Sequence, residues 1–76
     1  MNYENMTQQE MVLDWIATHG SITDLEAYDK LHIRRLADVI FKLQGKGYEF
    51  DHIWQTDRNA FGKKVRFMRY SFKFED

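Results

Sequence analysis

The chain has 76 residues, no cysteine, no proline and a formal net charge of −1. A chain this short forms a single domain, and without cysteine it has no disulfide, no thiol nucleophile and no cysteine-ligated zinc. No apolar run approaches the ~18 residues of a membrane span and residues 1–5 lack the pattern of a signal peptide, so we expect a cytoplasmic protein.

Two capping boxes mark the starts of the first two helices. We expect residues 1–6 to be a flexible tail and residues 7–74 to form the domain. Thr7 and Glu10 cap a helix over residues 8–18, with an apolar face of Met11, Leu13 (or Val12), Trp15 and Ile16 and a stop at Gly20. Thr23 and Glu26 cap a second helix over 24–31, which would bury Leu25, Tyr28 (or Ala27) and Leu31.

A third helix and a hairpin follow. The third helix is predicted over residues 34–45, with its buried face at Leu36, Ala37, Ile40 and Leu43. After Gly47 the period changes to two, because Tyr48, Phe50, His52 and Trp54 alternate with other residues, as do Met68, Tyr70, Phe72 and Phe74 beyond a turn at 57–63. The predicted fold is mainly α with a β-hairpin (α+β): three helices followed by a two-stranded wing. The predicted core contains Leu13, Trp15, Ile16, Leu25, Leu36, Ile40, Leu43, Trp54, Tyr70 and Phe72.

The second and third helices together read as a helix-turn-helix, whose second helix enters the DNA major groove. The outer face of that helix would carry Arg34, Arg35, Asp38 and Lys42. Arginine can fork onto guanine or phosphate, lysine can neutralise phosphate, and Asp38 could accept from cytosine or orient an arginine. The alternative is a solvated helix face in which Arg34, Asp38 and Lys42 form a ladder of ion pairs.

The distribution of charge favours nucleic acid as the partner. All eleven Lys and Arg residues lie within residues 30–73, a net of +7, whereas the first 29 residues hold six acids and no base. A second basic cluster lies in and after the hairpin turn, and it consists of Arg58, Lys63, Lys64 and Arg66. A hairpin beside a recognition helix can carry such basic side chains to the neighbouring phosphates or minor groove.

The order of these features resembles the short winged helix-turn-helix domains of bacteriophages and prophages. The residues that carry the resemblance are Gly20 to Ala27, Ile33 to Ala37, Ile40 to Leu43, Lys46 to Tyr48, Trp54, Gly62 to Arg66 and Tyr70. The chain departs from the family pattern at His32, where glycine is expected, and at Gly45. The resemblance implies a winged-helix fold that binds double-stranded DNA through helix 34–45 and wing 57–66. It further implies a phage or prophage transcription regulator or an accessory factor in recombination, nucleoid-associated when bound to DNA.

A protein-interaction function is the rival hypothesis. The acidic first 29 residues could engage a basic host protein and inhibit it, using the same fold. His19, His32 and His52 lie in three different elements and Glu49 and Asp51 share a strand face, so we expect no metal site, no cofactor and no catalysis. The chain is expected to be a monomer or weak homodimer, with Phe67 on the outer face of the hairpin as the apolar contact and Phe61 exposed at its tip.

Overall fold

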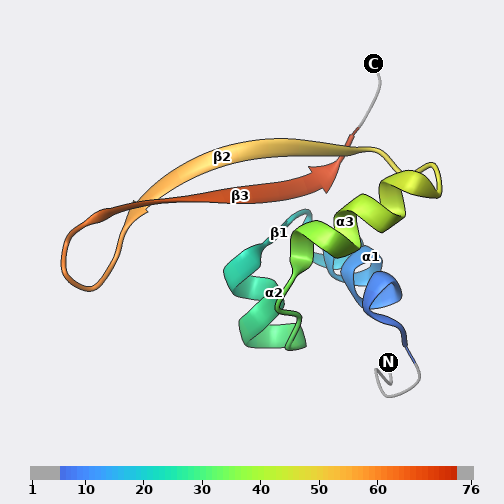
Figure 1. Cartoon of the computed structure of the whole chain (residues 1–76), viewed down its shortest axis with the longest axis horizontal. Coiled ribbons are helices and arrows are strands. Elements are labelled where there is room, and N and C mark those ends of the chain that lie inside the picture. The colour runs from blue at the N-terminus through green and yellow to red at the C-terminus, as the bar shows by residue number, and fades with distance from the viewer. Residues whose placement is uncertain (1–5, 74–76) are drawn as a thin grey trace.

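Three helices and a long hairpin make up the fold, shown in Figure 1. The structure is a computed structural model that describes residues 6–73, so the expected tail up to residue 5 and Phe74 lie outside the described residues. The elements run in the order α1 (Gln8–His19), β1 (Ile22–Thr23), α2 (Asp24–Leu31), α3 (Leu36–Gly45), β2 (Phe50–Arg58) and β3 (Lys64–Phe72). None of these helices is long and apolar enough to cross a membrane.

Both predicted capping boxes are confirmed. The hydroxyl of Thr7 accepts from the Glu10 amide at 3.2 Å, and the Glu10 carboxylate accepts from the Thr7 amide at 3.3 Å. Thr23 and Glu26 repeat the pattern at the start of α2. Gly20 ends α1 with a φ of 92°, as predicted, whereas α2 ends at His32 with a φ of 57°. His32 therefore takes the left-handed conformation that glycine would adopt at lower cost.

The sheet has three strands rather than two. β1 pairs antiparallel with β3, with Ile22 opposite Tyr70, and the strand order is β1-β3-β2. β1 forms because Ile22 and Thr23 are both buried, at 0% and 3% exposure, beside the inner half of β3. The predicted two-stranded wing is therefore corrected to a hairpin with a short third strand at the edge of its base.

The core lies between the helices and the inner end of the hairpin. It contains Val12, Ile16, Ile22, Ala27, Ile33, Leu36, Val39, Ile40, Leu43, Phe50 and Tyr70, with Leu13, Trp15, Leu31, Met68 and Phe72 packed partly buried against it. Two predicted members are wrong, since Leu25 is 74% exposed and Trp54 is 58% exposed. Leu25 lies two residues from the buried Ala27, and residues two apart point to opposite sides of a helix.

Trp54 is exposed because the hairpin extends beyond the helices that cover its base. Phe50 and Phe72 face each other at the base of the hairpin, and their face continues outward through His52 and Tyr70 to Trp54 and Met68. Figure 1 shows the outer part of β2 and β3 extending well past the helical body. Apolar alternation along the strand therefore continues beyond the point where helices cover the sheet.

The third helix is shorter and differently phased than predicted. It begins at Leu36 rather than residue 34, and it buries Val39 in addition to Leu36, Ile40 and Leu43. Ala37, predicted to be buried, is exposed. The late start follows from Ile33, which is 1% exposed and whose amide donates to the Ala27 carbonyl at 2.9 Å. The chain must leave that anchored position before a new helix can begin.

Candidate nucleic-acid interface

Arg34 and Arg35 lie in the turn before α3, not on its outer face as predicted. Both are exposed, and with Gln8, His32 and Asp38 they line a shallow hollow of about 330 Å³. Arg35 occupies the N-cap position, and its side chain makes no capping hydrogen bond within the described part of the chain. In contrast to α1 and α2, α3 therefore begins without a side-chain acceptor for its first amides.

The outer face of α3 contains half of the predicted ladder. Lys42 Nζ lies 3.2 Å from the Asp38 carboxylate, and both side chains are more than half exposed. Among residues 6–73, no ion pair joins Arg34 to Asp38. An exposed pair at this spacing stabilises a helix by only ~0.3–0.5 kcal/mol, so either side chain can be recruited by a ligand at little cost.

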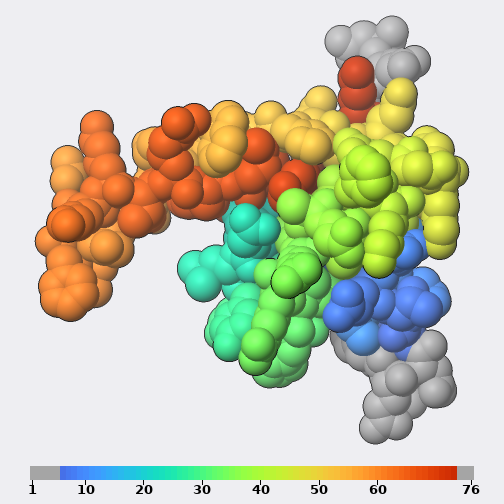
Figure 2. Space-filling view, viewed as in Figure 1, coloured from blue at the N-terminus to red at the C-terminus, as the bar shows by residue number. Residues whose placement is uncertain are grey.

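The hairpin turn gathers the four predicted wing residues. Arg58, Lys63, Lys64 and Arg66 are all exposed, and Asp57 is the only acid within residues 57–66, so this segment carries a net charge of +3. Figure 2 shows this outer end of the hairpin, in orange, standing apart from the helices. It is a basic projection with solvent around it.

Internal hydrogen bonds hold the turn in one shape. The Asn59 side-chain oxygen accepts from the amides of Phe61 at 2.9 Å and Lys63 at 3.1 Å, and Arg58 Nη1 donates to the Gly62 carbonyl at 2.7 Å. Phe61 is 92% exposed at the tip, as predicted. The basic side chains are thus presented from a turn that is held by its own hydrogen bonds.

Trp54, which was predicted to lie in the core, is exposed and is a candidate site residue. The Arg66 guanidinium lies over its exposed ring, 4.5 Å from the centroid. Trp54 stands opposite Met68, and Arg66 opposite Thr56, on the same face of the hairpin. The polar residues Thr56 and Arg58, which follow Trp54 on that face, are the signal that could have shown the face leaving the core.

A side-chain hydrogen bond joins α3 to the hairpin. The Gln44 amide nitrogen lies 3.0 Å from His52 Nε2, and the His52 ring meets the Tyr70 ring edge-on at 5.0 Å. His52 and Trp54 are two residues apart on β2 and share a face. The face of the hairpin that α3 covers is therefore the face that carries Trp54 and Arg66 farther out.

Tyr70 is the buried residue at this contact between α3 and the hairpin. Its ring is 6% exposed, and burial raises the pKa of the phenol above its ordinary value, with a further contribution from the Asp24 carboxylate. The phenol therefore stays neutral through the physiological range and into mildly alkaline solution. It serves the packing of the sheet rather than the charge of the exposed surface.

Several acids of the first 29 residues serve the fold. Glu10 and Glu26 each form part of a capping box. Glu26 also lies 3.5 Å from Arg69, and Arg69 donates to the Ser21 hydroxyl at 2.7 Å. Asp29 lies 3.5 Å from Lys30. The acidic segment is thus partly occupied by local contacts. In the wing, Arg58 and Arg66 make contacts within the hairpin, and no ion pair within residues 6–73 involves Lys63 or Lys64.

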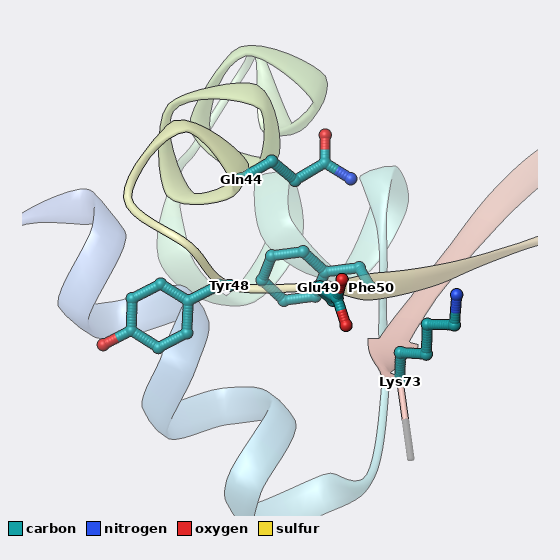
Figure 3. A pocket seen from close by; sticks show the side chains of 5 residues that line it. All are labelled: Gln44, Tyr48, Glu49, Phe50 and Lys73. Carbon is teal, nitrogen blue, oxygen red and sulfur yellow. The ribbon is translucent and has the colours of Figure 1, made fainter. Parts of the chain in front are cut away.

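The surface has hollows elsewhere along α3 and the hairpin. Figure 3 shows the first, of about 310 Å³, at the end of α3, with the opposite charges of Glu49 and Lys73 on its wall beside Gln44, Tyr48 and Phe50. The second, of about 510 Å³, lies between the start of α2 and the hairpin, where Leu25, Val65 and the half-buried Phe67 form its apolar wall. Within residues 6–73, no group of three or more His, Cys, Asp or Glu side chains could hold a metal ion.

Comparison with known proteins agrees with this architecture. No curated protein and no solved structure is significantly similar to the chain. Residues 7–74 match the family described as the winged helix-turn-helix domain. The match covers nearly the whole chain and both parts of the candidate interface, α3 and the hairpin, so the chain belongs to the winged helix-turn-helix domain family.

Proposed function

We propose that this protein binds double-stranded DNA, with α3 in the major groove and the hairpin wing on the adjacent backbone. Winged helix-turn-helix domains are typically DNA-binding modules rather than enzymes, and the helix-turn-helix places its second helix in the major groove. The observation that carries the proposal is the projecting turn at residues 57–66, with its net charge of +3. A projection with four exposed basic side chains and one acidic side chain can bind a polyanion such as DNA.

The start of α3 adds a second phosphate contact to the proposal. Arg34 and Arg35 flank a helix N-terminus that has no side-chain cap within the described residues. A DNA phosphate could accept from the first amides of α3 and from both guanidinium groups, because helix N-termini favour anions. Lys42, two turns along the outer face, could reach the backbone on the far side of the groove.

A salt titration tests duplex binding. Fluorescence anisotropy with a labelled 30-base-pair duplex should show log affinity falling with log salt. The slope should be about −4 to −5 if about five Lys or Arg side chains touch phosphate. The double variant Lys63→Ala/Lys64→Ala should weaken all duplexes alike and make the slope shallower by about 2. Changing Arg34 or Arg35 to Ala should likewise weaken binding to every duplex, and each change should make the slope shallower by about 1.

Lys73→Ala is the matched control. Lys73 is exposed and follows the opposite end of β3 from Lys64, roughly 30 Å away along an extended strand. Its loss should leave both affinity and slope nearly unchanged. Binding that is indifferent to salt, or a Lys73→Ala effect as large as that of the wing variant, would refute the proposed interface.

We propose in addition that the protein is a phage or prophage regulator of transcription or an accessory factor in recombination. This rests on the resemblance of its sequence motifs to the short phage domains. Immunoprecipitation of the protein with its bound DNA from the host, followed by sequencing, tests it. Enrichment at promoters supports regulation, enrichment at recombination sites supports the accessory role, and an absence of any enrichment refutes both.

A further inference from the structure

The outer face of α3 carries an apolar strip that neither basic cluster explains. Ala37, Phe41 and Gly45 follow one another at four-residue spacing and are all exposed, and Phe41 is 73% exposed. The helix buries Leu36, Val39, Ile40 and Leu43 on its opposite side. Phe41 is therefore not a core residue displaced to the surface, because the core-facing stripe of α3 is already complete without it.

The polar neighbours of Phe41 are engaged elsewhere. Asp38 and Lys42 pair with each other at 3.2 Å, and Gln44 is held by His52 on β2. Arg34 and Arg35 precede the helix, so they stand at its start rather than at its middle. The side chain that protrudes from the middle of α3 without a partner of its own is a phenyl ring.

Phe41 also lies on the side of α3 that adjoins the hairpin. Residues three apart are neighbours on a helix surface, and Gln44, three residues on, contacts β2. The basic residues Arg34 and Arg35 precede the helix and Lys42 lies in its last turn, with Asp38 as the one acid on α3. The surroundings of the ring thus suit an anionic partner with apolar groups at its centre.

The major groove of DNA offers one apolar group, the C5-methyl of thymine, and phenylalanine and alanine side chains are among those that contact it. We infer that Phe41 is a specificity-determining residue that packs on thymine methyl groups, with Ala37 beside it. The inference rests on the proposed function, since it requires α3 to enter the groove. The chain would then select thymine-containing steps by apolar contact, while its arginines and lysines hold the phosphates.

A pair of duplexes that differ only in the methyl group tests this directly. The probes are two 24-base-pair duplexes, one of alternating dA and dT and one in which deoxyuridine replaces every thymidine. Each methyl buried against the ring should raise affinity about fourfold, so a site with two such contacts should favour the thymine duplex about 15-fold. Phe41→Ala should bring the two duplexes to similar affinity, and Phe41→Leu should keep part of the preference.

Lys42→Ala is the matched control, because Lys42 is the next residue along and contacts only phosphate in this scheme. It should weaken both duplexes alike and leave their ratio unchanged. A wild-type protein that binds both duplexes equally, or a preference that survives Phe41→Ala, overturns the inference and leaves DNA binding intact. Failure to bind any duplex overturns the proposed function as well. If sedimentation shows a dimer that Phe41→Ala dissociates, with no thymine preference, then Phe41 contacts a second copy and the inference is wrong.

Discussion

Replacing Ile40 with Ala should remove a large share of the stability of this domain. Ile40 is 1% exposed and lies within the stripe that α3 presents to the core. The substitution deletes three buried carbons, worth about 2.4 kcal/mol at ~0.8 kcal/mol per group, and the cavity left behind raises the cost to about 3–4 kcal/mol. Small domains have ~5 kcal/mol or little more in total.

Urea unfolding followed by circular dichroism at 222 nm measures this loss, and a thermal scan should show a melting temperature lower by at least about 12 °C. Two control variants show whether the loss of stability comes from the cavity at position 40. Ile40→Val should cost only about 1 kcal/mol, and Phe41→Ala, one residue along on the exposed face, should stay within about 0.5 kcal/mol. If Ile40→Ala cost no more than Phe41→Ala, the phase assigned to α3 would be wrong.

Three further changes test other parts of the fold. Thr7→Ala should cost about 1 kcal/mol in urea unfolding, because it removes the acceptor for the Glu10 amide; no change would show that the cap is not formed in solution. His32→Gly should stabilise by up to about 1 kcal/mol, because a φ of 57° strains any side chain, whereas His32→Val should destabilise. The pKa of Tyr70 is raised in the folded protein, so its contribution is complete below the ordinary tyrosine pKa and is lost as pH rises through the folded value. Tyr70→Phe should therefore flatten the fall in melting temperature at alkaline pH, while Tyr48→Phe, at an exposed position, should not.

Local interactions made much of the fold readable from the sequence. A capping box requires only two residues three apart, and a left-handed helix end requires one glycine. The bounds of α1 and the start of α2 are therefore set by the residues at those positions. The period-two alternation likewise predicted the hairpin, and the clustering of Arg58, Lys63, Lys64 and Arg66 near its turn placed the basic wing.

Tertiary structure decided what these local rules leave open. The pairing of Ile22 with Tyr70 joins residues 48 apart in the chain, and a two-residue strand carries no signal without its partner. Trp54 has the side chain of a core residue, but it lies past the end of the helices that could have covered it. Arg34 and Arg35 fall before α3 because Ile33 is anchored to α2, and the same helix phase turns Phe41 outward. Periodicity specifies which residues share a face, whereas only the packing of one element on another determines which face is buried and where burial ends.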